Sequence, residues 1–147
     1  MNEIRVYFNR LHADAKIPEY GSFDAAGCDL YAVEDVDLEP GDIEVIHCGF
    51  SMEFPKEIEA QIRPRSGMAI KEGLTVVNSP GTVDADYRGE IMVGMINVSK
   101  TTKTVRKGDR IAQMVFVPIY RAHFLETTSG LSDTTRGVNG FGSTGRR

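Results

Sequence analysis

The sequence has no tryptophan, only two cysteines and three histidines, and no long apolar run. Cys28 and Cys48 match no metal-binding spacing and are too few for a disulfide scaffold, so we expect both to be small buried side chains. The longest apolar run is far shorter than the roughly 20 residues that cross a bilayer, which excludes a membrane helix. No segment sustains a helical period of about 3.6 residues, which excludes a mainly helical fold.

An excess of positive charge is also missing. The formal net charge is -4 at pH 7, whereas binding to a nucleic-acid backbone depends on clustered Lys and Arg side chains. We therefore expect no nucleic-acid partner, although local arginines leave a small anionic ligand open. The 147 residues suit one domain, and the N-terminal residues resemble neither a signal peptide nor a transit peptide, so the cytoplasm is the expected location.

Short apolar segments separated by turn residues predict an all-β fold. Alternation from Ile4 to Phe8 and from Ile58 to Ile62 indicates half-buried strands. The nearly continuous apolar segments Ile91 to Val98 and Arg110 to Ile119 indicate strands that are buried on both faces or lie at a subunit contact. Such strands at intervals of about ten residues favour a sandwich or a jelly roll.

Local signals place the turns and one helix. Gly41 and Gly108 lie in the sequences Glu39-Pro40-Gly41-Asp42 and Lys107-Gly108-Asp109, which are typical of turns. The segment from Ser66 to Glu72 is the only expected helix, with Ser66 as its cap and Gly73 as its end.

The segment Asn78 to Glu90 carries the most unusual set of polar residues. Ser79-Pro80-Gly81 predicts a turn with Gly81 at a positive φ. Asp84 and Asp86 would point to the same face of an extended chain, with Tyr87 beside them. By itself the segment is equally typical of a solvated β-hairpin.

Three other clusters combine polar groups with small residues or turns. Asp29 follows Ala26-Gly27-Cys28, where the backbone can approach a ligand closely, although an ordinary strand with an exposed Asp fits as well. Arg63-Pro64-Arg65-Ser66-Gly67 joins guanidinium groups to a helix start, which fits an anion site and an ordinary turn before a helix about equally well. Gln113 interrupts an apolar strand, so its amide must bond either the backbone or a ligand.

The tail from Thr127 to Arg147 is rich in Gly, Ser and Thr, a composition typical of disorder. It nevertheless contains Arg136 and Phe141 among glycines and hydroxyl groups. A flexible lid over an anionic ligand with a flat ring would need charge, an aromatic ring and glycine hinges. Both interpretations remain open from composition.

From about Ala26 to Gly145 the chain resembles the trimeric deoxyuridine triphosphate nucleotidohydrolases (dUTPases). Five motifs occur in the family's order: Ala26-Gly27-Cys28-Asp29-Leu30, Arg63-Pro64-Arg65-Ser66-Gly67, Gly81-Thr82-Val83-Asp84-Ala85-Asp86-Tyr87-Arg88-Gly89, Gly108-Asp109-Arg110-Ile111-Ala112-Gln113, and Arg136-Gly137 through Thr144-Gly145. One such motif is weak evidence, whereas five in order are specific. The chain departs from the pattern at Asn139, where the family usually has Gly, and Asn tolerates positive φ better than most residues.

The resemblance implies a distorted jelly-roll barrel of short strands with one short helix and a flexible C-terminal arm. Residues 1–126 would form the β domain, and residues 127–147 the arm that closes over the active site. The family's members are homotrimers whose active sites are shared between subunits. A homotrimer without membrane or nucleic-acid partners is therefore expected.

The resemblance also implies the reaction: hydrolysis of dUTP to dUMP and pyrophosphate by attack of water on the α-phosphorus. This activity removes dUTP from the DNA precursor pool and supplies dUMP for thymidylate synthesis. Asp84 would hold and deprotonate the water. Mg²⁺ would be held by the phosphates and by water, with no direct protein ligand and Asp29 at most an outer-shell partner.

Each substrate-binding role is carried over from the family's motifs. Tyr87 would exclude a 2′-hydroxyl, and Asn78 with the backbone near Thr82, Val83 and Met92 would recognise uracil. Arg65, Ser66, Gly67 and Gln113 would bind the phosphates. The arm would add Arg136 at the γ-phosphate, Phe141 stacked on uracil, and Gly142, Ser143 and Thr144.

Three alternatives compete with this interpretation. A dCTP deaminase resembles the family in fold, but the complete tail motif and Asp84 argue against it. A regulatory protein controlled by nucleotide occupancy would be indicated by a lost base or tail, and both are present. For a structural jelly roll of capsid type, the five motifs would be coincidence. Pyrophosphate release from dUTP alone would settle the class.

Overall fold

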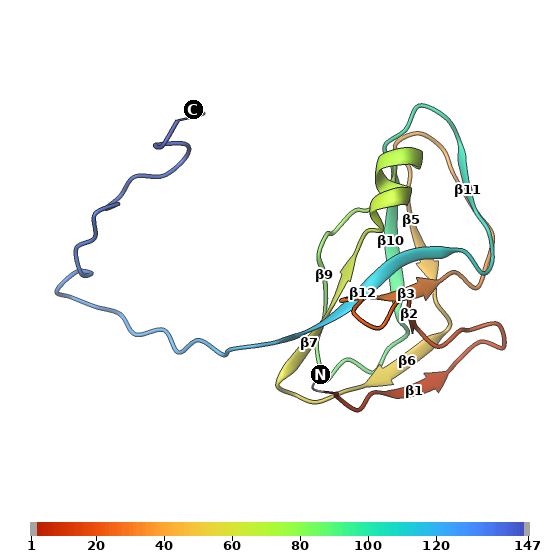
Figure 1. Ribbon diagram of the computed structural model, residues 1–147, viewed down its shortest axis with the longest axis horizontal. Helices are drawn as coiled ribbons and strands as arrows, with labels where there is room; N and C mark the ends of the chain where they lie inside the picture. Colours follow the sequence, from red (N-terminus) through yellow and green to blue (C-terminus); the bar gives the residue numbers. More distant parts are fainter. Residues whose placement is uncertain (1–2, 146–147) are drawn as a thin grey trace.

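The computed structural model describes residues 3–145, so both ends of the chain, including the last two residues of the expected arm, lie outside the described residues. Within this range the chain forms a β body, and its C-terminal segment leads away from that body (Figure 1). Short strands account for nearly all regular structure, and a single short helix, η1 (Met68–Glu72), is present in the described part. The prediction of an all-β fold with one short helix is confirmed.

The strands form four antiparallel sheets within the described range. The largest has the order β2 (Glu19–Tyr20), β3 (Cys28–Tyr31), β12 (Arg110–Pro118), β7 (Ile58–Arg63) and β9 (Gly81–Val83). A second has the order β5 (Ile43–His47), β10 (Met92–Asn97) and β8 (Leu74–Val76). Two pairs complete the body: β1 (Tyr7–Arg10) with β6 (Phe50–Glu53), and β11 (Lys103–Val105) with β4 (Val36–Leu38).

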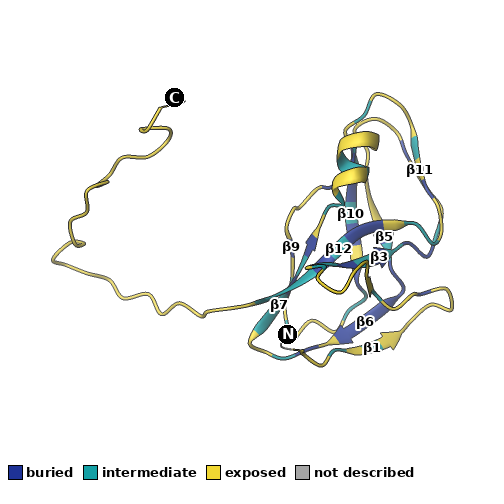
Figure 2. Cartoon of the chain, viewed as in Figure 1, coloured by how far each residue is buried: buried dark blue, intermediate teal, exposed yellow. Residues whose placement is uncertain are grey.

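One cluster of buried apolar side chains joins the sheets. Figure 2 shows the buried residues in the strands of the body and none in the arm. Leu30 and Met114 enter it from the five-stranded sheet, and Ile46 and Met95 enter it from the three-stranded sheet. Phe50 is also buried and stacks on Phe8 with the ring centroids 4.8 Å apart. Because burial of each such side chain contributes about 1.5–3 kcal/mol, this cluster fixes the strands that carry the polar residues.

The two cysteines are buried and unpaired, as predicted. Burial raises the pKa of the Cys28 thiol to about 11. Burial also raises the pKa of Cys48, to about 12. Since the thiolate is the reactive form, neither side chain is a nucleophile at neutral pH.

The turns predicted at Gly41 and Gly108 occur, and both glycines adopt a positive φ. Gly41 has φ +89°, and Asp42 N–H bonds the Glu39 carbonyl at 3.0 Å. Gly108 has φ +90° between β11 and β12. Gly73, at φ +71°, ends the helix and donates to the Met68 carbonyl. These positions depend only on local backbone conformation, which is why the sequence predicts them.

Other local predictions are wrong. The first strand begins at Tyr7 rather than Ile4, because β1 pairs only with β6 and extends no further than its partner. The described helix start has no side-chain cap, so Ser66 does not cap it. In β10, Val93 and Met95 are buried while Met92 is 39% exposed, so within one chain this strand is buried on a single face. A subunit contact remains the alternative for its outer face.

The segment from Asn78 to Glu90 is not a β-hairpin. β9 pairs with β7, whereas β10 pairs with β5 and β8, so the segment connects two different sheets. Gly81 does not occupy the turn; it begins β9, and the preceding Ser79-Pro80 bond is cis. The chain does turn before Gly81, but Gly81 does not have the predicted positive φ. The partners of both strands are distant in sequence and could not be inferred from the turn signal.

Candidate active site

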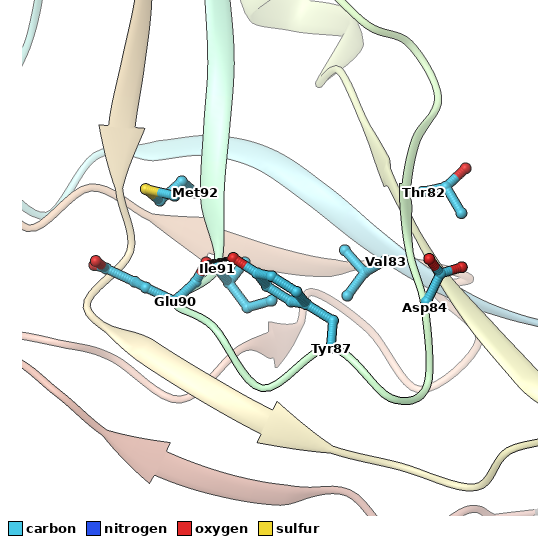
Figure 3. A pocket seen from close by; sticks show the side chains of 7 residues that line it. All are labelled: Thr82, Val83, Asp84, Tyr87, Glu90, Ile91 and Met92. Atoms are coloured by element: carbon cyan, nitrogen blue, oxygen red, sulfur yellow. Dashed lines mark hydrogen bonds between the residues drawn. The ribbon is translucent and has the colours of Figure 1, made fainter.

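A pocket of about 210 Å³ lies between the end of β9 and the start of β10 (Figure 3). It is lined by Thr82, Val83, Asp84, Tyr87, Glu90, Ile91 and Met92. The pocket therefore brings together the expected base, Asp84, the expected sugar-binding ring, Tyr87, and three residues expected to recognise uracil. Glu90 and Ile91 also line it, although no sequence pattern had selected them.

A tight turn separates Asp84 from Tyr87. Tyr87 N–H donates to the Asp84 carbonyl at 3.1 Å, and the Arg88 guanidinium donates to the Ala85 carbonyl at 2.7 Å. The segment is therefore not extended, and the expectation that Asp84 and Asp86 share one face by strand alternation is wrong. Asp84 itself is exposed at the edge of the pocket, where a carboxylate can reach a bound water.

The Tyr87 ring lies across the pocket towards Glu90 (Figure 3). Its hydroxyl donates to the Glu90 carbonyl at 3.0 Å. A Cβ atom at Gly89 would lie 2.5 Å from Tyr87 Cζ and 2.8 Å from Cε2, closer than carbon atoms approach. Glycine at position 89 is thus required for the ring to occupy this place.

Asn78 lies beside the pocket rather than in its lining. A Cβ atom at Gly81 would lie 3.2 Å from Asn78 Nδ2, and one at Gly94 would lie 3.6 Å from Asn78 Oδ1. The amide therefore lies against the backbone of both β9 and β10, the two strands whose ends form the pocket. An amide in this place carries both a donor and an acceptor.

A second polar cluster lies where β3, β7 and β12 are neighbours. Asp29 Oδ1 is 3.1 Å from Arg65 Nε, and Asp29 Oδ2 is 3.5 Å from the Arg110 guanidinium. Arg65 also donates to the Arg110 carbonyl at 3.1 Å. Since the Asp29 side chain is only 16% exposed, these contacts fix the direction of both arginines. The sequence identified Asp29 and Arg65 as site residues but not their contact.

Gln113 belongs to this second cluster. It lies in register with Asp29 on β3, and its side-chain amide donates to the Pro64 carbonyl at 3.0 Å. A Cβ atom at Gly27 would lie 2.5 Å from Gln113 Oε1, so the close approach predicted around Gly27 accommodates this side chain. The amide therefore satisfies the backbone and still presents its oxygen near Gly27.

The remaining expected site residues do not join either cluster within one chain. Ser66 and Gly67 lie in the first turn of the helix region, and both are exposed. Beyond β12 the arm leads away from the body and is exposed (Figures 1 and 2). Phe141, which lies in this arm, is fully exposed. The Arg136 side chain donates to the Asn139 carbonyl at 2.9 Å, a contact within the arm. The single chain thus presents three separate groups: the pocket, the Asp29 cluster and the arm.

Cation ligands are not clustered in the described residues. Among residues 3–145, no group of three or more His, Cys, Asp or Glu side chains is arranged to hold a metal ion. Asp29 already contacts two arginines and does not fit a direct ligand. Separately, within the same residues no helix is long and apolar enough to cross a membrane.

Known proteins match this chain over nearly its whole length. The family model for dUTPase matches residues 13–145. A deoxyuridine 5′-triphosphate nucleotidohydrolase from Nautilia profundicola is 47% identical over 143 residues, covering 97% of this chain and all of the relative. The dUTPase of Staphylococcus bacteriophage 80alpha with dUPNHPP has a TM-score of 0.89 and 26% identity, covering 96% of this chain and 98% of that one.

A third match concerns a metal ion. A dUTPase variant from phage phi11 of S. aureus, described with a coordinated structural Mg(II) ion, has a TM-score of 0.81 at 24% identity and covers 87% of this chain and 99% of that one. At this identity the match carries the fold alone. The family model and the relatives make this all-β chain a nucleotide hydrolase. The chain belongs to the dUTPase family, the enzymes that hydrolyse dUTP.

Proposed function

We propose that this protein converts dUTP to dUMP and pyrophosphate in the pocket between β9 and β10, with Asp84 as the general base. Asp84 is an exposed carboxylate at the pocket edge, beside the ring that would bind the sugar. A carboxylate in hydrogen-bond reach of a water can take its proton as the oxygen attacks phosphorus. The oxygen–phosphorus bond then forms at the α-phosphorus while the bond to pyrophosphate breaks.

The pocket suits a deoxyuridine group. Backbone groups near Thr82, Val83 and Met92, with the amide of Asn78, would pair with the edge of uracil. Tyr87 would lie against the deoxyribose and leave no room for a 2′-hydroxyl. The support is the pocket's small volume, about 210 Å³, and its lining by residues at the end of β9, at the start of β10 and between these strands. A wrong base or sugar would clash or leave buried polar groups unpaired, which discriminates strongly.

The Asp29 cluster suits the triphosphate. Arg65 presents a guanidinium whose direction is fixed by Asp29, and Gln113 lies alongside. Ser66 and Gly67 would add a hydroxyl and a backbone N–H at the start of the helix region. Arginine is well matched to phosphate because it donates in a rigid planar fork.

Mg²⁺ would enter with the substrate, because the described residues form no cage of carboxylates for it. The phosphate oxygens and water would supply its ligands, as a hard cation prefers. When bound, the ion would neutralise part of the triphosphate charge. Asp29 would act only through a bound water, since both of its oxygens lie close to arginine.

We further propose a homotrimer in which different subunits supply the pocket, the phosphate-binding cluster and the arm. The support is that one chain leaves these three groups apart. Apolar side chains also remain uncovered: Ile43 and Val45 on β5 are 56% and 55% exposed, and Phe124 and Leu125 beyond β12 are 91% and 82% exposed. Contact between copies would bury them.

The proposal divides the chain into a β domain of residues 1–126 and an arm of residues 127–147 that closes over bound nucleotide. Arg136 would reach the γ-phosphate, and Phe141 would stack on uracil, with Gly142, Ser143 and Thr144 beside them. A cytoplasmic location is part of the same proposal, and the unpaired buried cysteines agree with a reducing compartment.

The test is pyrophosphate release with Mg²⁺ from dUTP, dCTP, dTTP and UTP in parallel. Release from dUTP alone is expected. Release of ammonia from dCTP would instead support the deaminase alternative. Binding of dUTP without any release would support a regulatory role. Sedimentation of the same sample tests the trimer independently of activity.

A further inference from the structure

Glu90 connects the pocket to a bend in the chain that lies outside it. One carboxylate oxygen, Oε1, accepts the Gly49 N–H at 2.9 Å, and the other, Oε2, lies 2.8 Å from His47 Nδ1. The Glu90 carbonyl accepts the Tyr87 hydroxyl at 3.0 Å. A single residue therefore contacts both the bend between β5 and β6 and the ring expected to select the sugar.

The bend is itself rigid. Gly49 has φ +73°, and a Cβ atom there would lie 2.7 Å from His12 Cβ and 2.9 Å from Val33 Cγ1. The Gly49 carbonyl accepts from the backbone of both Leu11 and His12. The Gly49 N–H points the other way, to the Glu90 carboxylate. The bend is therefore a fixed anchor to which Glu90 is attached.

The residues on either side of Gly49 are both hydrogen-bonded to the backbone of Ile91. Cys48 N–H bonds the Ile91 carbonyl at 3.1 Å, and Ile91 N–H bonds the Phe50 carbonyl at 2.8 Å. Ile91 is 2% exposed, whereas the Glu90 side chain is 25% exposed and extends away from Tyr87 (Figure 3). The contact between the Glu90 carboxylate and Gly49 N–H therefore lies between two backbone hydrogen bonds that hold the next residue, Ile91.

From these contacts we propose that Glu90 is a positioning residue for Tyr87, held by Gly49 and His47, and that it sets the discrimination between deoxyribose and ribose. Discrimination by a missing hydroxyl requires the ring to stay within a fraction of an ångström of one place. The Tyr87 hydroxyl is fixed by the Glu90 carbonyl, and Gly89 permits the ring to lie there. This inference rests on the proposed role of Tyr87 in sugar selection.

The experiment measures kcat/KM for dUTP and for UTP in the full-length protein and compares the ratio between variants. Glu90→Ala removes both contacts of the carboxylate and should lower the dUTP/UTP ratio by roughly 3- to 10-fold, the scale of one net hydrogen bond. Glu90→Gln keeps an acceptor for Gly49 N–H and should restore most of the ratio. Gly89→Ala forces the ring to move and should lower the ratio at least as much as Glu90→Ala.

A double-mutant cycle separates positioning from a general loss of stability. Tyr87→Phe removes only the exposed hydroxyl, so this variant should fold and should also lower the ratio. If Glu90 acts through that hydroxyl, adding Glu90→Ala to Tyr87→Phe should change the ratio by less than about 2-fold. Thermal unfolding of the same proteins measures the stability of each variant, and all of them should remain folded at the assay temperature, so that a change in the ratio reflects the site and not unfolding.

Three results would overturn the proposal in distinguishable ways. A ratio that is unchanged in Tyr87→Ala would remove Tyr87 from sugar selection, and this inference with it. A ratio that falls in Tyr87→Ala and in Tyr87→Phe but is unchanged in Glu90→Ala would leave the role of Tyr87 intact and remove Glu90, whatever the result for Gly89→Ala. Independent effects of Glu90→Ala and Tyr87→Phe on the ratio would also remove Glu90, even if both lower it.

Discussion

A carboxylate oxygen of Asp29 lies 3.1 Å from the guanidinium Nε of Arg65. Asp29 is on β3 and Arg65 follows β7, and β12 lies between these two strands in the sheet. Arg110 approaches the other carboxylate oxygen at 3.5 Å. One shielded carboxylate therefore orients two cations, and through them the surface expected to bind the triphosphate. This orienting role explains why an acidic residue, Asp29, lies beside a surface expected to bind phosphate.

We expect Asp29→Asn to lower turnover of dUTP by roughly 10-fold, because a guanidinium that is free to rotate loses its alignment with the phosphates. Affinity for dUMP, which lacks two of the phosphates, should change less. The measurement is steady-state hydrolysis beside calorimetric titration with dUMP. Asp37→Asn, an exposed carboxylate that accepts from Thr104, is the matched control and should leave both quantities unchanged. Equal losses in dUTP turnover and dUMP binding would contradict the orienting role.

Asp84→Asn should lower turnover by roughly 10²-fold or more while nucleotide binding stays nearly intact, since an amide cannot take the proton of the attacking water. Asp86→Asn is the control, because the two carboxylates lie in the same turn region. Rapid-quench hydrolysis and equilibrium binding of a non-hydrolysable dUTP analogue measure the two effects separately. Turnover in Asp84→Asn within a factor of two of the parent would remove Asp84 as the base.

His47 should make stability depend on pH. The hydrogen bond to Glu90 raises the pKa of His47 above its ordinary value, the charges of Glu90 and Glu34 add to this, and partial burial opposes it. A raised pKa means that the pair contributes stability below the unfolded pKa of about 6.5 and loses it as the pH rises through the folded pKa.

In His47→Gln the dependence of the unfolding free energy on pH should therefore be flatter above about pH 6. The difference should stay below about 1 kcal/mol, because the His47 side chain is 45% exposed and solvent screens the pair. Urea unfolding from pH 5 to pH 9 measures it. His123→Gln, in the exposed segment after β12, should retain the parent's dependence. Parallel curves for the parent and His47→Gln would show that the pair contributes nothing.

The sequence predicted those parts of the fold that depend on neighbouring residues. Gly41, Gly73 and Gly108 adopt positive φ where a turn or a helix end was expected. The pairing of β9 and β10 was wrong, because each strand pairs with partners that only the complete fold brings near. Alternation of apolar residues shows which face of a strand is buried but not which strand lies beside it.

The same distinction applies to the site. Asp84 and Tyr87 were identified through a contiguous motif, and a local turn does bring them to one pocket. Glu90 was missed because its partner His47 is 43 residues away and no periodicity connects them. The Asp29 and Arg65 contact was also missed, although both residues were named, since only strand pairing makes them neighbours.

The arm is where composition and family membership predict different behaviour. Residues 127–145 are exposed throughout, and the hydrogen bonds described for them are local to the arm. A segment with so little apolar surface cannot offset its ordering entropy alone, so we expect it to close only over bound nucleotide. Closure would gain a Phe141 stack on uracil of about 1–3 kcal/mol and a charge-assisted contact between Arg136 and phosphate.

Deleting residues 136–147 should leave the fold and the oligomer intact and should lower turnover of dUTP far more than binding of dUMP, because the arm's contacts are strongest with the full triphosphate. Phe141→Ala should fall between the deletion and the parent, since it removes the stack but keeps Arg136. Steady-state hydrolysis measures both, and hydrogen exchange of residues 127–147 should slow when a non-hydrolysable dUTP analogue is added. Full activity of the truncated enzyme, or exchange that ignores the analogue, would make the arm an ordinary disordered terminus.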